Sequence, residues 1–202
     1  MAAGRPVRSH DADPADELLA EIARLKRDLA HAEHKIAELE ARADVDPLLD
    51  ILNRRGFERE LARSLAYVGR YGTAAALMFI DLDGFKAVND QYGHAAGDAL
   101  LKAVAHKLTG HVRASDVVAR LGGDEFGVLM WHVDKARATA KAAELEALIA
   151  DVRADHPAGF GEFQLSVGGS AGAVALSPDT TVAAMIDAAD KAMYARKKQR
   201  RG

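Results

Sequence analysis

The chain has 202 residues, a length that favours one domain with an appended segment over two full domains. Apolar residues make up 49% of it and charged residues 28%, which is typical of a folded globular protein and argues against a disordered chain. The net charge of −3 excludes an overall basic surface for nucleic acid or anionic lipid.

Cysteine is absent, which excludes disulfides, Cys-ligated zinc, iron–sulfur clusters and thiol nucleophiles. The longest strictly apolar run, Ala74–Ile80, is far shorter than the roughly 20 residues that cross a bilayer. The N-terminus also lacks the apolar stretch of a signal peptide. We therefore expect a cytoplasmic protein with no membrane span and no nucleic-acid partner.

The N-terminal part of the chain changes character after residue 15. Residues 1–15 show no periodicity and are predicted to form a flexible tail. Segment 16–43 carries apolar residues at alternating spacings of four and three, which is the heptad pattern of a coiled coil. We predict a homodimer formed through 18–43, with an amphipathic helix packed on its own domain as the alternative. The seam residues are Leu18, Ile22, Leu25, Leu29, Ala32, Ile36, Leu39 and Ala43.

A proline follows this helix and marks the start of a second part. Asp44-Val45-Asp46-Pro47 ends the helix, because the residue before a proline is driven out of the α region. We assign 44–52 as a hinge and 46–202 as the globular domain. The next predicted elements are a helix capped by Asn53 and running through Arg70, a buried strand over Ala74–Asp81, and a helix over Asp83–Leu108 interrupted at Gly93-His94.

The second half of the domain begins with a predicted hairpin, in which a Gly-Gly-Asp-Glu turn separates two short strands. The last helix has one apolar face, formed by Val182, Met185, Ile186, Ala189 and Met193. This alternation predicts an α/β sandwich with helices packed on a sheet of mixed direction. The predicted elements are strands at Val117–Leu121 and Phe126–Trp131, a helix at Lys135–Ala150, a strand or hairpin at Phe163–Leu176, and a helix at Thr181–Arg200.

Two acidic pairs follow strands of the predicted sheet. Asp81 and Asp83 emerge at the end of the buried strand with the Leu82 carbonyl between them, and Asp124-Glu125 occupy the hairpin turn. If strand and hairpin are neighbours, four carboxylates converge, which implies a bound cation or raised pKa values. Oxygen-only ligands favour Mg²⁺, with substrate phosphates completing its shell. The alternative is a set of solvated loop acids.

The residues around these acids include the sequence Arg120-Leu-Gly-Gly-Asp-Glu-Phe126. This is the signature that names the GGDEF family of diguanylate cyclases, and the chain resembles that family from 46 to 202. The other matches are the nucleotide segment Phe79-Ile-Asp-Leu-Asp-Gly-Phe-Lys-Ala-Val-Asn-Asp90 with Gly93-His94 and Gly97-Asp98, the entry motif Asp46-Pro-Leu with Asn53-Arg-Arg, and the last-helix motif Asp190-Lys-Ala-Met-Tyr194 with Lys197.

The resemblance implies a palm-like nucleotidyl-cyclase fold and a homodimer that condenses two GTP into cyclic di-GMP with loss of two pyrophosphates. Asp81, the Leu82 carbonyl and Asp124 would hold Mg²⁺ or Mn²⁺, with Glu125 beside the reacting ribose and phosphate. The residues do not show whether Asp124 or Glu125 takes the proton. Lys86, a third catalytic candidate beside Asp124 and Glu125, would lie near the phosphates together with the N–H groups of Gly84 and Phe85; a solvated surface lysine is the alternative.

Other family positions concern the nucleotide. Asn89 and Asp98 match the pair that reads guanine, whose N1–H and amine suit a carboxylate and an amide oxygen; His94 matches a position near the nucleotide. Asp98 has the alternative role of favouring its helix N-terminus, and His94 that of a turn residue. Lys197 and Arg201 match phosphate-contacting positions, but the chain reads Arg200-Arg201-Gly202 where the family usually has Gly-Arg-Asn.

A tetrapeptide upstream of the signature suggests product inhibition. Arg113-Ala-Ser-Asp116 stands where the family has an inhibitory site for cyclic di-GMP, and its Arg113 would clamp phosphate or guanine bidentately. The alternative is a surface ion pair between Arg113 and Asp116. The entry motif departs from the family at Leu49-Asp50, which replace the usual Thr-Gly and leave the interdomain geometry open.

Two other functions are compatible with parts of the sequence. Gly168-Gly-Ser-Ala-Gly172 fits the G-x-S-x-G nucleophile elbow of hydrolases, but that elbow needs a following helix and a later histidine. The chain instead continues as a predicted strand, and its last histidine is His156. The remaining alternative is a catalytically silent GGDEF domain that binds cyclic di-GMP or GTP as an effector.

Overall fold

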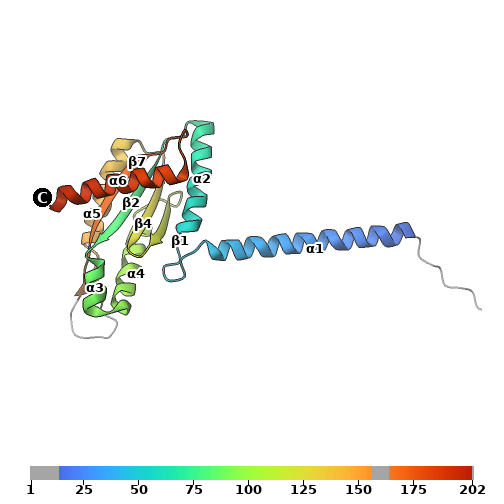
Figure 1. Ribbon diagram of the computed structural model, residues 1–202, viewed down its shortest axis with the longest axis horizontal. Helices are drawn as coiled ribbons and strands as arrows, with labels where there is room; N and C mark the ends of the chain where they lie inside the picture. Colours follow the sequence, from blue (N-terminus) through green and yellow to red (C-terminus); the bar gives the residue numbers. More distant parts are fainter. Residues whose placement is uncertain (1–13, 156–163, 202) are drawn as a thin grey trace, which may run out of the picture. The chain divides into compact units, whose positions relative to one another are not determined.

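The computed structural model describes residues 14–155 and 164–201, and the chain divides into two compact units after Arg42. The described part of the first unit belongs to helix α1 (Pro14–Ala43), whose last residue is counted with the second unit (Figure 1). The helix predicted over 16–43 is therefore confirmed, and it ends where the Asp44–Pro47 segment was expected to stop it. Most of the predicted tail, residues 1–13, lies outside the described residues. No helix within the described ranges combines the length and apolar character needed to cross a bilayer.

The second unit is an α/β sandwich built on a five-stranded sheet with strand order β1-β3-β4-β2-β7 (Figure 1). Strand β1 pairs parallel with β3, and the other neighbours pair antiparallel, so the predicted mixed sheet is confirmed. Its elements are β1 (Leu52–Asn53), α2 (Arg54–Tyr71), β2 (Ala75–Asp83), α3 (Phe85–Tyr92), α4 (His94–Gly110), β3 (Val117–Gly122), β4 (Glu125–Trp131), α5 (Lys135–Ala150), β5 (Ala154–Asp155), β6 (Gln164–Leu165), β7 (Gly168–Ala175) and α6 (Val182–Arg201).

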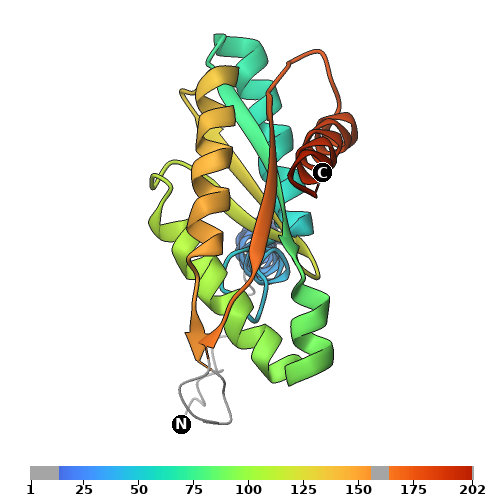
Figure 2. The same cartoon turned by 90° about the vertical axis from the view of Figure 1, so that its left-hand side faces the viewer.

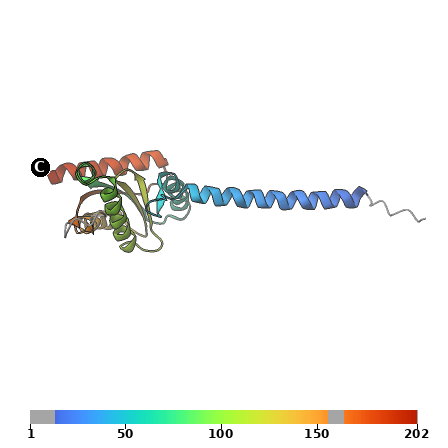
Figure 3. The same ribbon diagram turned by 90° about the horizontal axis from the view of Figure 1, so that it is seen from below.

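Helices cover both faces of the sheet, which explains why β2 is apolar at nearly every position. Leu77 and Phe79 belong to the core beneath α2 and α6, whereas Met78 and Ile80 belong to the core beneath α4 and α5. Successive side chains of a strand point to opposite faces, so a strand covered on both sides carries no polar alternation. Figures 2 and 3 show these two helix pairs on opposite sides of the sheet.

Local signals set several element boundaries. The Asn53 side chain accepts a hydrogen bond from the Gly56 N–H at 3.0 Å, which confirms it as the cap of α2. The helix expected from Asp83 begins instead at Phe85, because Asp83 still pairs in β2 and Gly84 adopts a φ of 83°. That positive φ favours glycine and turns the chain from strand to helix.

The segment Phe163–Leu176 differs from the prediction of one strand or hairpin. Gln164–Leu165 pair with β5 in a separate two-stranded sheet, while β7 is an edge strand of the main sheet. Phe163 lies outside the described residues. Short strands of two residues carry too little alternation to be read from a sequence, which is why β1 and β5 were not predicted.

The glycines of β7 are explained by close packing. A Cβ atom at Gly172 would lie 1.9 Å from the Met193 nitrogen of α6, and one at Gly169 would lie 2.9 Å from the Ile149 side chain of α5. The helices therefore approach the strand more closely than any side chain would allow. This arrangement confirms that the Gly-x-Ser-x-Gly sequence is a sheet strand and not a nucleophile elbow.

Replacing Gly172 by alanine is expected to lower the free energy of unfolding by roughly 3 kcal/mol, because the added methyl meets backbone atoms that cannot move aside cheaply. Gly110 is the matched control, since a Cβ there meets nothing within 4 Å and alanine in the last turn of α4 gains at most about 1 kcal/mol. Urea denaturation measures both. Equal midpoints for Gly172→Ala and the wild type would contradict the packing argument.

Candidate active site

The two acidic segments meet at one end of the sheet. In the pairing of β2 with β4, Asp81 lies opposite Glu125, and the Leu82 N–H donates to the Asp124 carbonyl at 3.1 Å. The turn between β3 and β4 is closed by Gly123, which has a φ of 44°, a conformation that favours glycine. The predicted neighbourhood of strand and hairpin is confirmed, and it brings the carboxylates of Asp81, Asp124 and Glu125 near one another.

This proximity changes the pKa values of the hairpin acids. Burial raises the pKa of Asp124 and outweighs the hydrogen bond from its own backbone, and the charge of Asp81 raises it further. Burial also raises the pKa of Glu125; Arg54 opposes this, while Asp124, Asp81 and Asp190 add to it. Both carboxylates thus lie in a setting where the ionised form is costly unless a cation is present.

Asp83 lies beside Asp81, since Lys197 Nζ pairs with both carboxylates, but it has further partners of its own. Its Oδ2 accepts a hydrogen bond from Ser170 Oγ at 2.8 Å, and its Oδ1 lies 3.0 Å from Lys197 Nζ. Burial raises the pKa of Asp83, but these contacts and the charges of Lys197 and Arg200 outweigh it, so the pKa is lowered. Sequence reasoning does not identify Ser170 as a site residue, because its partner Asp83 lies 87 residues away in the chain.

No three Asp, Glu or His side chains within residues 14–155 and 164–201 are arranged to hold a metal ion together. The ligand set expected from the sequence contains only two carboxylates, Asp81 and Asp124, with the Leu82 carbonyl as the third oxygen. Those residues are adjacent in space through the contacts of β2 with the hairpin. An all-oxygen set with excess negative charge fits a hard divalent cation such as Mg²⁺.

Two arginines that sequence reasoning missed hold the hairpin in place. Arg54 donates from Nε to the Leu121 carbonyl at 2.7 Å and from Nη2 to Glu125 Oε2 at 3.3 Å. Arg120 donates twice to the Gly123 carbonyl, at 3.0 and 2.8 Å, and its Nη1 donates to Asp46 Oδ2 at 3.2 Å. Both arginines lie in the quoted motifs, but their long-range partners are not visible in a sequence.

The segment after β2 offers backbone N–H groups to an anion. Gly84 is the N-cap of α3 and makes no side-chain cap hydrogen bond, so the N–H groups of the first turn remain available. Phe85 is buried and anchors the helix, and Lys86 is exposed beside it. This placement agrees with an anion-binding role for Gly84, Phe85 and Lys86.

The predicted guanine-reading residues lie on α3 and the start of α4. Asn89 Oδ1 is buried, and it has no hydrogen-bond partner within the described part of the chain. A Cβ atom at Gly97 would lie 2.0 Å from this oxygen, so glycine is needed for Asn89 to occupy its position. Asp98 and His94 are exposed on α4. The unpaired acceptor of Asn89 fits a ligand that donates hydrogen bonds.

Helix α6 brings Lys197 to the acids, where its Nζ pairs with both Asp81 and Asp83. The preceding residue anchors the helix: Arg196 Nη2 lies 3.1 Å from Oε2 of Glu146, a buried acid of α5 that also accepts a hydrogen bond from the Ala171 N–H of β7. Arg201 is the last residue of α6, and its side chain lies outside the part described.

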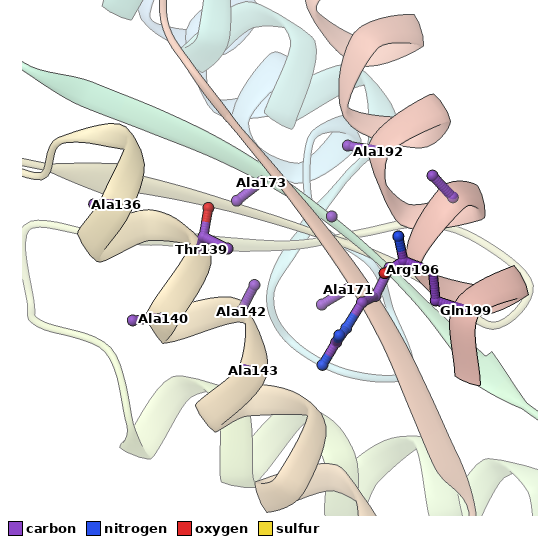
Figure 4. A pocket seen from close by; sticks show the side chains of 12 residues that line it. Ala136, Thr139, Ala140, Ala142, Ala143, Ala171, Ala173, Ala192, Arg196 and Gln199 are labelled. Atoms are coloured by element: carbon purple, nitrogen blue, oxygen red, sulfur yellow. The ribbon is translucent and has the colours of Figure 1, made fainter.

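An alanine-rich groove of about 590 Å³ lies between α5, β7 and α6. Figure 4 shows Arg196 reaching from α6 across β7 beside this groove. The lining combines Ala171 and Ala173 of β7 with alanines of both helices. The small side chains allow α5 and α6 to lie close to the edge strand β7. This close packing keeps α6 within reach of α5, where Arg196 pairs with Glu146.

The Arg113–Asp116 tetrapeptide lies in a separate pocket of about 350 Å³. Asp116 accepts hydrogen bonds from the N–H groups of Arg113, at 3.0 Å, and Trp131, at 3.1 Å. The surface ion pair considered as the alternative is therefore not formed, and Arg113 is exposed. Arg137 and Lys141 of α5 line the same pocket. These two cations were not assigned from the sequence, because only packing brings α5 to this loop.

Comparisons with known proteins agree on one family. The family described as "Diguanylate cyclase, GGDEF domain" matches residues 43–202. The chain is 40% identical over 179 residues to the probable diguanylate cyclase DgcE of Escherichia coli, covering 87% of this chain and 16% of that protein. It is 38% identical over 192 residues to the diguanylate cyclase TpbB of Pseudomonas aeruginosa, covering 93% and 41%. The chain thus spans less than half the length of these relatives.

Solved structures show the same fold. A sensory box/GGDEF family protein from Caulobacter crescentus is 36% identical, with a TM-score of 0.69, covering 77% of this chain and 99% of that one. The GGDEF domain of DgcB from the same organism, solved in complex with c-di-GMP, is 26% identical, with a TM-score of 0.72 and coverage of 78% and 91%.

Proposed function

We propose that this chain, which belongs to the GGDEF-domain family of diguanylate cyclases, condenses two GTP into cyclic di-GMP and releases two pyrophosphates. The observation that carries the proposal is the register of β2 with β4, which sets Asp81 opposite Glu125 and beside Asp124. The globular domain that would perform the reaction is 46–202. In each of two displacements, a ribose 3′-oxygen bonds to an α-phosphorus and the bond from that phosphorus to pyrophosphate breaks.

Asp81, Asp124 and the Leu82 carbonyl would hold Mg²⁺ or Mn²⁺. A divalent cation there would neutralise phosphate charge and lower the pKa of the attacking hydroxyl. We assign Glu125 to accept the proton of the 3′-hydroxyl, because Asp124 is assigned to the cation, whereas the Glu125 carboxylate lies opposite Asp81 and is oriented by Arg54. Asp124, as a ligand of the cation, would then remain ionised.

The nucleotide would be held at both ends. Asn89 and Asp98 supply the acceptors that the N1–H and amine of guanine need. His94 lies in the first turn of α4, close in the chain to Asp98. The N–H groups of Gly84 and Phe85, together with the side chains of Lys86, Lys197 and Arg201, would bind the triphosphate.

Nucleotide selectivity tests this assignment. Adenine presents an acceptor at N1, so it cannot satisfy a carboxylate there. Purified protein with Mg²⁺ is expected to form a cyclic dinucleotide from GTP and none from an equal concentration of ATP. Turnover of both nucleotides at similar rates would show that Asn89 and Asp98 do not read the base.

We infer a separate inhibitory site for cyclic di-GMP at Arg113 and Asp116. Because Asp116 bonds to backbone N–H groups, it shapes the loop and leaves the Arg113 guanidinium for phosphate or guanine. Arg137 from the same pocket adds positive charge toward the product phosphates, whereas Lys141 there is paired with Glu144 at 2.6 Å. Product would then slow synthesis when it accumulates.

We also propose that α1 joins two subunits through the seam 18–43. In the described part of the seam, Leu18, Ile22, Leu25 and Leu29 are 39–61% exposed, which is costly for large apolar side chains unless a partner covers them. A second copy of α1 with the same heptads provides that cover. The reaction needs two GTP-loaded domains, so dimerisation would set how often they meet.

Leu29→Asp is therefore expected to lower turnover per subunit about tenfold or more at dilute protein, with recovery as the concentration rises, because pairing becomes bimolecular. Arg27→Asp changes an exposed residue of the same helix outside the seam and serves as the control. Activity and sedimentation over a dilution series measure the effect. Unchanged activity of Leu29→Asp at the lowest concentration would contradict dimerisation through α1.

A further inference from the structure

An ammonium group lies at the acids that would hold the cation. Lys197 Nζ pairs with Oδ1 of both Asp81 and Asp83, and its side chain is 18% exposed. Lys197 thus occupies the site as a protonated counter-ion.

The two carboxylates differ in how firmly they are held. Asp83 also accepts the Ser170 hydrogen bond at 2.8 Å and lies 3.8 Å from Arg200 Nη1. In the described part of the chain, the side chain of Asp81 pairs with Lys197 alone. Asp83 is therefore a fixed anchor, whereas Asp81 is the carboxylate that exchanges one cation for another.

The backbone of α6 is fixed while the lysine side chain can move. Arg196 is paired to the buried Glu146, and Arg200 donates to the Gly169 carbonyl, so residues on both sides of Lys197 are tied to α5 and β7. Lysine places its charge on a flexible four-carbon stem. The ammonium can leave Asp81 without movement of the helix.

We propose that Lys197 is a built-in counter-ion that keeps the metal from Asp81 until nucleotide phosphate draws the ammonium away. This inference rests on the proposed function, which assigns Asp81 to the cation and Lys197 to the triphosphate. A divalent cation and an ammonium repel each other at one carboxylate, so Lys197 and the metal compete for Asp81. Because binding free energies are linked reciprocally, phosphate that recruits Lys197 raises the affinity for metal, and metal raises the affinity for nucleotide.

The test measures Mn²⁺ binding to the nucleotide-free full chain by calorimetry. Lys197→Met is expected to bind Mn²⁺ about tenfold more tightly than the wild type, because a close opposite charge shifts the affinity of a carboxylate for a proton by a comparable factor. Arg200→Met removes an equal charge near Asp83 without touching Asp81 and is expected to change binding less than about threefold. Lys191→Met, whose lysine pairs with Asp187 on the same helix, is expected to change nothing.

The double variant Lys197→Met with Asp81→Asn shows whether the metal binds at Asp81. It is expected to lose the tighter Mn²⁺ binding of the single variant Lys197→Met. If Lys197→Met binds Mn²⁺ no more tightly than Arg200→Met, the counter-ion proposal is wrong, whether or not the wild type makes cyclic di-GMP. If the double variant binds Mn²⁺ as tightly as Lys197→Met alone, the proposal is also wrong. A wild type that makes no product while Lys197→Met shows the Asp81-dependent gain would refute the proposed function and leave this inference standing.

Discussion

Asp124→Ala protein is expected to form cyclic di-GMP at least about 100-fold more slowly than the wild type, because a ligand lost from a metal site costs more than the 10- to 100-fold typical of its supporting residues. Asp124 lies at the hairpin turn, where its carbonyl accepts the Leu82 N–H and its carboxylate faces the charge of Asp81. Initial rates of product formation with GTP and Mg²⁺ measure the loss. Asp179→Ala, which alters an exposed acid away from the site, is expected to keep full activity.

The same variant separates chemistry from folding. Burial and the charge of Asp81 raise the pKa of Asp124, so the ionised carboxylate destabilises the metal-free fold, and this penalty grows as pH rises above the ordinary aspartate pKa. Asp124→Ala is therefore expected to melt no lower than the wild type at neutral pH without metal. A variant that kept its turnover would remove Asp124 from the mechanism.

Arg113→Ala is expected to raise the cyclic di-GMP concentration for half-inhibition by at least about 30-fold, because truncating one partner of a charged hydrogen-bonded pair costs about 2–5 kcal/mol. Its turnover in the absence of product is expected to stay at the wild-type level, since Arg113 lies in a pocket lined by none of the residues assigned to catalysis. Arg137→Ala is expected to show a smaller shift of the same sign.

For both arginine variants, the concentration for half-inhibition is measured from initial rates at increasing concentrations of added cyclic di-GMP. Lys102→Ala, which removes an exposed positive charge from α4, is the charge control and is expected to leave the curve unchanged. If Arg113→Ala is inhibited at the wild-type product concentration, cyclic di-GMP does not act through this pocket.

Much of the fold follows from local patterns in the sequence. The helix of α1, the Asn53 cap of α2 and the burial of β2 follow from residues close in the chain, and each is confirmed. Strands β1, β5 and β6 have two residues each, and their pairing depends on distant partners. No local period reveals such strands.

In the candidate site, too, local signals can be predicted from the sequence and contacts between distant residues cannot. The positions of the Asp81 and Asp124 segments follow from strand and turn signals, but the partners of these acids do not. Lys197 and Asp81 are separated by 116 residues, and Ser170 and Asp83 by 87. The reason for glycine at position 172 likewise appears only when α6 packs against β7. The sequence context already favours a sheet strand over a hydrolase motif there, and the sheet pairing confirms the strand.

The most direct measurement is incubation of the purified chain, stripped of bound nucleotide, with GTP and Mg²⁺, followed by chromatography and mass spectrometry of the products and a pyrophosphate assay. The account predicts cyclic di-GMP with two pyrophosphates released for each molecule formed. Tight binding of cyclic di-GMP without any product from GTP would contradict it and identify the chain as a silent effector.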